Sequence, residues 1–310
     1  MTTSLIHYTP NFFISYYLVY SFLFYYSTKG ALVNDWKLIF VNIPTNHDLL
    51  LTNDKKHWST FLHPRYNKVN SPDYKVVFMM VVTPFYDKKT QCLSCKHSYS
   101  TTRIRSRFVK LAGHDSDFCP LYESSEINPL LYNVSVCPMC GFSYTDDFTA
   151  YIPSVLKSEL EKKISLHWQP QDYGKQRSYS DAINTYKLAA YCALIKKEKK
   201  VTIAGLYLRT AWLYRKTGEQ EQERRFINLA THEYIDAYLT DGVPASLMSE
   251  TKLLYIIAEL LRRQDKIDES VAYLSKVIGK QHLSTEPKII EMARERWYEI
   301  REVYRETKSI

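Results

Sequence analysis

Four cysteines form the strongest chemical signal in the sequence. They occur as two C-x-x-C pairs, Cys92 with Cys95 and Cys137 with Cys140. Two intervening residues let the chain turn so that both sulfurs of a pair reach one ion at about 2.3 Å. Four thiolates complete the coordination sphere of a tetrahedral Zn²⁺. The spacing therefore predicts one structural zinc ion, with no open position for catalysis.

Two other uses of these cysteines fit the sequence less well. A thioredoxin-like redox site needs one C-x-x-C before a helix in a βαβ unit, not two widely separated pairs. A disulfide framework is typical of short secreted chains, whereas this chain has 310 residues and no convincing export signal. Metal binding in a cytoplasmic protein is the prediction. Gly141 can supply the positive φ of such a turn, and Tyr99 and Phe142 can pack under the ion.

A polar cluster lies between the two cysteine pairs and is formed by His114, Asp115, Asp117 and Cys119. These residue types could hold a second metal ion or carry out acid–base chemistry. Residues of this kind more often cap turns and bind local backbone amides. Both interpretations stay open, and the first of them gives our third hypothesis for function, an enzyme.

Three arginines alternate after the first cysteine pair: Arg103, Arg105 and Arg107. On a strand they would share one face. Such a face could contact phosphate groups or an acidic partner, which gives nucleic-acid binding as our second hypothesis. The same charges also suit a solvated strand face that offsets the negative charge of a four-thiolate zinc site.

The composition is that of a globular protein. Hydrophobic residues make up 45% and charged residues 24%, which excludes disorder of the whole chain. The chain has only 8 glycines and lacks the phosphate-loop, dinucleotide-binding, nucleophile-elbow and H-E-x-x-H motifs. Nucleotide-binding, hydrolase and zinc-protease functions therefore have no local support. The net charge of +8 is modest and favours solubility.

Residues 1–78 differ from the rest of the chain. The run from Phe12 to Tyr26 is short and tyrosine-rich for a membrane span, and it lacks the basic start and cleavage site of a signal peptide. We interpret residues 1–78 as an atypical extension from a mis-assigned start, with Met79 or Met80 as the true one. The alternatives are a soluble extension and a membrane anchor. Membrane association is expected only if residues 6–26 are a genuine anchor.

From Pro153 onward the apolar residues recur with a period near 3.6, which predicts seven helices. The first helix is expected from Pro153 to Lys163, and Ser180–Asp181 should cap the second. The third should run from Thr202 to Gly218, and the fourth, around Phe226, should end at Gly242. Ser249 should start the fifth, Gly279 should end the sixth, and Pro287 should start the seventh. Cys192 lies among apolar helical neighbours and is expected to be buried.

Two of these helix pairs repeat. The shift that places Leu206 on Leu253 also places Ala211 on Ala258 and Arg215 on Arg262. This pattern is typical of tetratricopeptide-like hairpins, which stack into a curved surface that binds a peptide or protein. Several arginines of these helices could grip a carboxylate there or remain solvated: Arg209, Arg215, Arg224, Arg225, Arg262 and Arg263.

The order of motifs resembles the bacterial domain-of-unknown-function family 2225 over residues about 79–310. The resemblance rests on the first C-x-x-C, the arginine-rich strand, Asp115-x-Asp117-Phe118-Cys119, Asn128-Pro129-x-x-Tyr132 and Val136-Cys137-Pro138-x-Cys140-Gly141. Members begin with a Pro-Phe-Tyr-Asp-like lead, as at Pro84, which favours a late start. The chain departs from the pattern at Lys96, where glycine is usual, and at His114, where arginine is common. Neither change removes a ligand, and the family has no assigned activity.

These observations predict an α+β fold in three parts: an extension at residues 1–78, a small zinc-ribbon-like β module at 79–150, and an all-α tetratricopeptide-like helical-repeat domain at 151–310. Our first hypothesis is a cytoplasmic, non-catalytic adaptor. It would hold one structural Zn²⁺ and bind a protein or peptide on the helical-repeat surface, with nucleic acid as the alternative partner.

Overall fold

The computed structural model describes residues 82–241, 247–282 and 284–308, together with three short strands before them. The chain divides into two units, Met1–Thr83 and Pro84–Ile310. In the first unit, β1 (Asn42–Ile43), β2 (Lys68–Ser71) and β3 (Tyr74–Val77) form an antiparallel sheet in the order β1-β3-β2. The candidate anchor at residues 6–26 and the candidate starts Met79 and Met80 lie outside the described residues.

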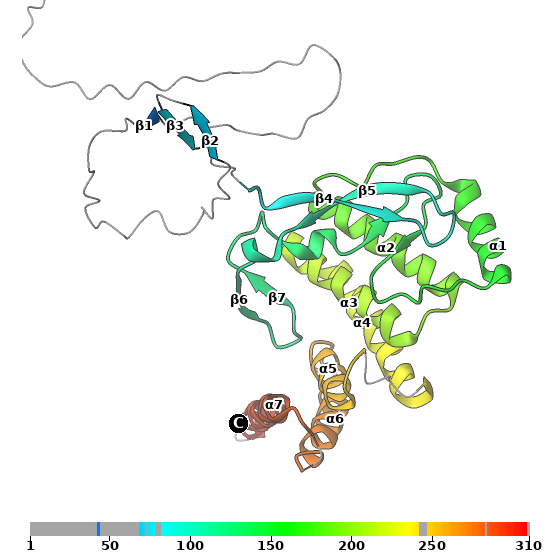
Figure 1. Ribbon diagram of the computed structural model, residues 1–310. Coiled ribbons are helices and arrows are strands. Elements are labelled where there is room, and N and C mark those ends of the chain that lie inside the picture. The colour runs from blue at the N-terminus through cyan, green and yellow to red at the C-terminus, as the bar shows by residue number, and fades with distance from the viewer. Residues whose placement is uncertain are drawn as a thin grey trace, which may run out of the picture. The chain divides into compact units, whose positions relative to one another are not determined.

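The described part of the second unit has the predicted α+β composition, with three two-stranded antiparallel sheets before seven helices (Figure 1). The strand pairs are β4 (Phe85–Gln91) with β5 (Ser98–Ile104), β6 (Leu111–His114) with β7 (Pro120–Tyr122), and β8 (Ser135–Val136) with β9 (Ser143–Tyr144). The first hairpin is in register from Phe85 opposite Ile104 to Gln91 opposite Ser98. Short 3₁₀ helices at Ser106–Phe108 and Pro129–Tyr132 connect the hairpins.

All seven helices occur where the apolar period predicts them. They are α1 (Ser154–Lys163), α2 (Tyr179–Lys196), α3 (Lys200–Thr217), α4 (Gln220–Asp236), α5 (Glu250–Arg262), α6 (Ile267–Gly279) and α7 (Pro287–Lys308). A 3₁₀ helix at Ser165–His167 follows α1, and a π-helical turn at Ala237–Asp241 extends α4. The stop expected at Gly242 lies outside the described residues. None of the helices in the described ranges is long and apolar enough to cross a membrane.

Helix starts are set by local hydrogen bonds that the sequence predicts only in part. Ser249 caps α5 by accepting from the amide of Lys252, as expected. At α2 the prediction of Ser180 as the cap is wrong, because Ser178 and Asp181 form a reciprocal capping box two residues earlier. Thr202 does not cap α3 either, since that helix begins after Lys199 without a side-chain cap.

The cysteine-bearing hairpins and α2 share one hydrophobic core. Phe142 is buried beside the cysteines, and Tyr99 packs against the same cluster. The amide of Ser143 donates to Sγ of Cys192 at 3.2 Å, so Cys192 is a buried packing residue, as predicted. The hydroxyl of Tyr186 donates to the carbonyl of Leu130 at 3.0 Å. Helix α2 therefore packs against β8–β9 and the 3₁₀ helix at Pro129–Tyr132.

Two helical hairpins, α3 with α4 and α5 with α6, bury residues at positions that the sequence shift equates. Leu206, Ala211, Leu253 and Ala258 occupy the positions that the sequence shift equates, and all four are fully buried. Helix α5 also contributes to a second core with α6 and α7, through Leu254, Tyr255 and Ala258. Small alanines at the equivalent positions let neighbouring helices approach closely.

A buried ion pair closes the turn between α2 and α3. The side chains of Lys196 and Glu198 are each only 1% exposed and contact one another directly. Lys196 donates to the carbonyl of Thr149 at 2.8 Å, and Glu198 accepts from the amide of Thr149 at 3.1 Å. Lys197 between them has a φ of 55°. The pair therefore ties the segment before α1 to the end of α2.

Replacing Glu198 by alanine is expected to destabilise the protein by about 3–5 kcal/mol, because an unpaired lysine charge remains buried. Urea unfolding at neutral pH measures this free energy. The matched control is Glu159→Ala, which removes the partner of the exposed Lys163 and should cost less than about 0.5 kcal/mol. Equal effects of the two substitutions would contradict the structural importance of the buried pair.

Candidate metal centre

The two cysteine pairs occupy the turns of two hairpins. Cys92 and Cys95 lie between β4 and β5, and Cys137 and Cys140 lie between β8 and β9. The turns are separated in sequence, yet all four sulfurs lie within 4.8 Å of one another. The structure therefore brings together all four residues predicted as metal ligands, and these sulfurs could hold one metal ion.

The sulfur positions fit a tetrahedral ion. Sγ of Cys92 lies 3.7 Å from Sγ of Cys140, and Sγ of Cys95 lies 3.6 Å from Sγ of Cys137. Bonds of about 2.3 Å in a tetrahedron place neighbouring sulfurs about 3.8 Å apart. Three of the cysteines are buried and Cys95 is exposed. One ion at the centre of this cluster would be largely shielded from water.

Both turns have the same backbone pattern. The amide of Lys96 donates to the carbonyl of Cys92 at 3.1 Å, and the amide of Gly141 donates to the carbonyl of Cys137 at 2.9 Å. The residue after each pair has a positive φ, 63° at Lys96 and 71° at Gly141. A side chain makes this conformation costly. The lysine in the first turn therefore carries backbone strain that the glycine in the second avoids.

The pKa values of the cysteine thiols differ within this cluster. Hydrogen bonds from Cys140 and Cys92 to the thiolate of Cys137 lower the pKa of Cys137 to about 2. The side-chain hydrogen bond between Cys92 and Cys137 raises the pKa of Cys92 to about 12. A metal ion that binds all four sulfurs must displace the protons that remain on the cysteine thiols.

Trp168 covers the second turn from outside. Its indole N–H donates to the carbonyl of Pro138 at 2.9 Å, and a Cβ added at Gly141 would lie 2.5 Å from its ring. The hydroxyl of Ser165 donates to the carbonyl of Cys140 at 3.2 Å. Sequence reasoning missed both residues, because residues 164–175 show no period and the indole is recognisable as a support only beside Gly141.

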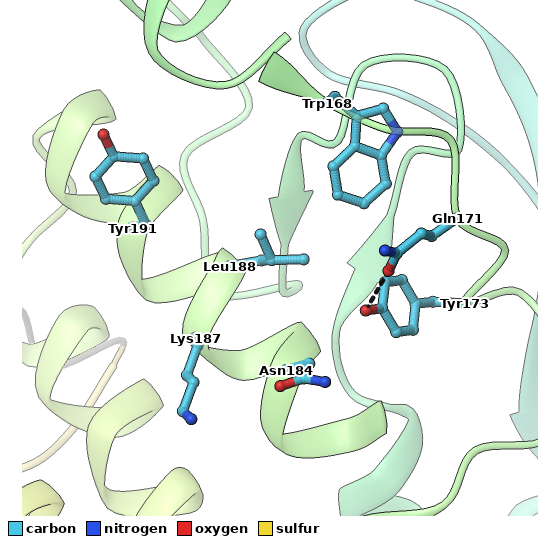
Figure 2. Close-up of a pocket in the computed structure, with 7 residues that line it drawn as sticks. All are labelled: Trp168, Gln171, Tyr173, Asn184, Lys187, Leu188 and Tyr191. Atoms are coloured by element: carbon cyan, nitrogen blue, oxygen red, sulfur yellow. Dashed lines mark hydrogen bonds between the residues drawn. The ribbon is translucent and has the colours of Figure 1, made fainter. Parts of the chain in front are cut away.

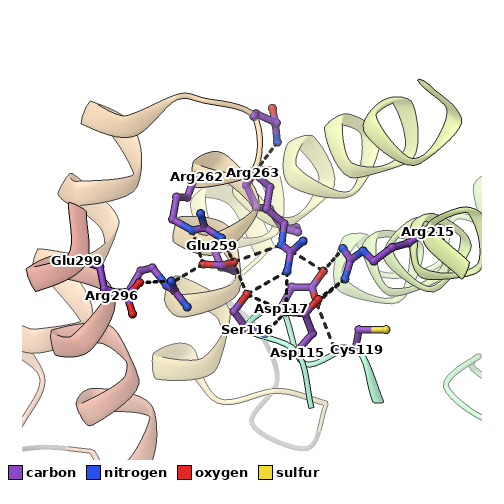
Figure 3. A network of polar contacts seen from close by, with 12 residues as sticks. Asp115, Ser116, Asp117, Cys119, Arg215, Glu259, Arg262, Arg263, Arg296 and Glu299 are labelled. Atoms are coloured by element: carbon purple, nitrogen blue, oxygen red, sulfur yellow. Dashed lines mark hydrogen bonds and ion pairs between the residues drawn. The ribbon is translucent and has the colours of Figure 1, made fainter. Parts of the chain in front are cut away.

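The acidic part of the predicted polar cluster is held by arginines of the helices (Figure 3). Asp117 is fully buried and pairs with Arg215 at 2.6 Å. It also accepts from the indole N–H of Trp212 at 3.1 Å. Asp115 pairs with Arg215 at 2.8 Å and with Arg263 at 2.9 Å. These carboxylates also bind local amides, those of Ser116 and Cys119, as turn residues do.

The side chains of the other two members of the cluster take no part in these ion pairs. His114 is an exposed strand residue of β6 opposite Pro120. Cys119 is buried, and burial together with the charge of Asp117 raises the pKa of its thiol to about 12. A thiol with this pKa is protonated at neutral pH and is a poor nucleophile. The structure thus separates the four residues into a paired acidic loop, an exposed histidine and an inert thiol.

Glu259 of α5 is the second centre of the network and was missed by sequence reasoning. Its side chain is fully buried and pairs with Arg262 at 2.7 Å and with Arg263 at 3.2 Å. It also accepts from the hydroxyl of Ser116 at 2.5 Å and lies 3.5 Å from Arg296 of α7. One acidic loop is therefore connected to α3, α5 and α7. The carboxylates that these arginines grip belong to the chain itself.

The network lowers the pKa of two of its carboxylates, Asp115 and Glu259. Burial disfavours the charge of Asp115, but the amide of Ser116 and the guanidinium groups of Arg263 and Arg215 outweigh it, so its pKa is lowered. Burial also opposes the charge of Glu259, and hydrogen bonds from Arg262 and Ser116 lower its pKa in the same way. Both groups are therefore charged at neutral pH.

The expectation that three arginines share one strand face is wrong. Strand β5 ends at Ile104, and a 3₁₀ helix begins at Ser106, so the alternation of a strand is interrupted. Arg103 donates to the hydroxyl of Ser135 at 2.8 Å and to the carbonyl of Asn133 at 3.2 Å. It thus binds the chain's own loop, and the guanidinium groups of Arg105 and Arg107 lie over the rings of Tyr86 and Phe108.

A comparison with protein-family models assigns the chain. The model of DUF2225, described as an uncharacterized protein conserved in bacteria, matches residues 85–300. The chain belongs to this family. The DUF2225 match includes all four cysteines, the acidic loop and Glu259, so the resemblance based on the motifs is confirmed. Searches of curated proteins and of solved structures gave no match for this DUF2225 member.

The two turns of this DUF2225 protein allow a matched test of backbone strain. Lys96→Gly should stabilise the protein by up to about 1 kcal/mol, because glycine adopts a positive φ without the cost of a side chain. Gly141→Ala should destabilise it and weaken metal binding, because its Cβ would meet Trp168 at 2.5 Å. Urea unfolding and metal titration measure both changes. The same sign for the two substitutions would refute the assignment of strain to Lys96.

A fall in pH should reduce the stabilisation that the Asp115 and Glu259 ion pairs provide. The pKa values of Asp115 and Glu259 are lowered in the folded protein, so their stabilisation is complete above the unfolded value of about 4. It is lost as the pH falls through the folded values. Asp115→Asn should therefore destabilise the protein at pH 7, and its difference from wild type should shrink in acid.

The control for this pH dependence is Asp146→Asn, which changes an exposed aspartate. Urea unfolding of all three proteins at pH 7 and at pH 3 makes the comparison, and any metal release in acid is common to them. A difference between wild type and Asp115→Asn that stays constant with pH would contradict the role given to the carboxylate.

Proposed function

We propose that this protein is a non-catalytic adaptor built around one structural Zn²⁺ bound by Cys92, Cys95, Cys137 and Cys140. The observation that carries the proposal is the convergence of four sulfurs within 4.8 Å. Soft thiolate ligands in a tetrahedron favour zinc, and four of them leave no coordination position for a substrate. Each pair lies in a hairpin turn, which is the arrangement of a zinc ribbon.

In this proposal the ion holds two hairpins together. Strands β8 and β9 have only two residues each, and such a short hairpin is not stable alone. Binding of structural zinc contributes on the order of 10 kcal/mol to folding in small metal-dependent modules. The ion therefore fixes the end of β4–β5 on β8–β9 and, through them, on α2.

The adaptor role rests on the helices and on the state of the polar cluster. The hairpins α3–α4 and α5–α6, with equivalent buried residues, support a tetratricopeptide-like array that presents a binding surface. The carboxylates of the acidic loop are all taken up by ion pairs, and Cys119 is a protonated, buried thiol. These facts favour binding over catalysis by the cluster.

The surface left for a partner is restricted. Arg215 and Arg263 already pair with the acidic loop, and Arg209 and Arg262 pair with Asp147 and Glu259. These four arginines therefore do not offer a free carboxylate clamp. Nucleic-acid binding was our second hypothesis. One of its three arginines, Arg103, donates to carbonyl groups of the chain itself. We therefore propose that the protein binds a protein or peptide partner on another surface of the helices.

The zinc proposal predicts one zinc ion per full-length chain, measured by plasma mass spectrometry after extensive dialysis. Cys137→Ser should lose the ion and most of its folding stability, because one of the four ligands is removed. Cys119→Ala is the matched control, since it removes a buried cysteine outside the metal cluster and should retain the zinc. Iron in place of zinc, or a folded chain free of metal, would contradict the proposal.

The adaptor proposal predicts a specific protein partner. The tagged full chain, cross-linked in its own bacterial cells, should recover a protein that is absent from cells carrying the tag alone. That protein should bind the purified, zinc-loaded chain with a defined stoichiometry. If purified chain binds none of the recovered proteins but turns over a small-molecule substrate, the adaptor proposal is wrong.

A further inference from the structure

The two cysteine turns differ in their exposure to solvent. In the first turn, every residue from Cys95 to Ser98 is exposed. In the second turn, every residue from Cys140 to Thr145 is buried. Cys95 is the one exposed member of the four-cysteine cluster. A small reagent dissolved in water therefore reaches the cluster at Cys95, from the side of the first turn.

The second turn is covered by side chains from a later segment of the chain. Trp168, which also lines a pocket beside α2 (Figure 2), donates through its indole N–H to the carbonyl of Pro138 at 2.9 Å. The hydroxyl of Ser165 donates to the carbonyl of Cys140 at 3.2 Å. The first turn is held by its own backbone, for example by the amide of Cys92, which donates to His97 at 2.9 Å. The cover on one turn explains why only the other presents its sulfur.

The sulfur nearest to the exposed thiol belongs to the other hairpin. Sγ of Cys95 lies 3.6 Å from Sγ of Cys137, which is fully buried. A disulfide bond is about 2.05 Å long, so the two sulfurs need to approach by about 1.5 Å to form one. Small side-chain rotations supply this movement. The resulting bond would join the same two turns that a metal ion joins.

We propose that Cys95 is a modification site, at which a hydroperoxide oxidises the metal centre and leaves a disulfide between Cys95 and Cys137. Oxidation of cysteine is selective for accessible sulfurs with thiolate character. In a four-thiolate cluster with one exposed member, this selectivity assigns the first attack to Cys95. The inference rests on the proposed zinc centre, which is the reduced state of this site.

The reaction takes two steps, written here for hydrogen peroxide. The sulfur of Cys95 attacks one oxygen, the O–O bond breaks, and the departing hydroxide takes a proton from solvent, which leaves a sulfenic acid on Cys95. The sulfur of Cys137 then attacks the sulfur of Cys95, the S–O bond breaks, and a second hydroxide leaves as water. The two thiolates lose two electrons, and the peroxide gains them and becomes two water molecules.

The disulfide changes what holds the two hairpins together. Its sulfurs are no longer thiolates, so only Cys92 and Cys140 remain as ligands, and the chain would release the ion. The covalent bond then connects β4–β5 with β8–β9 in place of the metal. A dithiol reductant reverses the change, because it takes up the disulfide electrophile and restores both thiols.

The first test is a map of disulfides in the oxidised full chain. Trypsin leaves the first cysteine pair in the peptide of residues 90–96 and the second pair, with Cys119, in the peptide of residues 111–157. The map is made on Cys119→Ala, which retains the cluster and removes the extra thiol of the long peptide. Chains purified in reductant are treated with one equivalent of hydrogen peroxide, and a colorimetric chelator reports the zinc released.

Oxidation should release one zinc ion per chain and join the two peptides, with the bond placed between Cys95 and Cys137 by tandem mass spectrometry. Dithiothreitol and added zinc should restore the original metal content. A disulfide within either peptide, a bond between Cys92 and Cys140, or zinc that stays bound would overturn the proposal.

The second test compares two ligand substitutions. Cys95→His and Cys140→His each replace the second cysteine of a pair by another common zinc ligand, so both should retain the ion. With peroxide, Cys95→His should release zinc at least about tenfold more slowly than wild type, because its exposed ligand is not a thiolate. Cys140→His keeps Cys95 and Cys137 and should release zinc within about twofold of the wild-type rate. Equal rates for the two variants would overturn the proposal, and the peptide map decides it without either substitution.

Zinc content before and after peroxide separates this proposal from the proposed function. A chain purified in reductant that holds no zinc would refute the structural zinc centre, whatever peroxide does to its cysteines. A chain that holds one zinc ion and keeps it in peroxide would refute the modification site and leave the zinc centre standing.

Discussion

The second unit depends on the meeting of two distant chain segments at one point. The turn after β4 and the turn after β8 each supply two sulfurs, and neither turn can complete a tetrahedral site alone. Strands β8 and β9 around the second turn have only two residues each. An ion at this point would replace the extensive strand pairing that a larger β module uses for stability. It would also orient Trp168, whose indole N–H donates to the carbonyl of Pro138.

The acidic loop makes the second long-range connection. Two aspartates bind Arg215 and Arg263, and Ser116 binds Glu259, so one turn contacts helices α3 and α5 together (Figure 3). The same charges on the surface would contribute little, but Asp117 and Glu259 are fully buried. Removing one partner of such a pair is costly because the other charge remains uncompensated. The loop is therefore a structural element, because its polar groups bind the helices and hold them in place.

Sequence reasoning predicted the features that depend on local spacing. It missed the features that depend on contacts with residues far away in the sequence. The C-x-x-C spacing identified all four possible ligands because two intervening residues define the turn. The period of 3.6 located all seven helices, and Ser249 and Pro287 marked starts correctly. Trp168 and Glu259 were missed, because Pro138 and Ser116, to which they connect, lie far away in the sequence. The shared face of three arginines failed because a 3₁₀ helix follows Ile104, and nothing in the alternation itself indicates that break.

X-ray absorption spectroscopy at the zinc edge tests the central claim most directly, because it reports the atoms bound to the ion rather than its presence alone. The zinc-loaded full chain should show four sulfur atoms at about 2.3 Å and no nitrogen or oxygen ligand. That result would place the ion among Cys92, Cys95, Cys137 and Cys140, the four sulfurs that the fold brings together. Nitrogen or oxygen ligands, or fewer than four sulfurs, would contradict a closed structural site and with it the account of how this unit is held together.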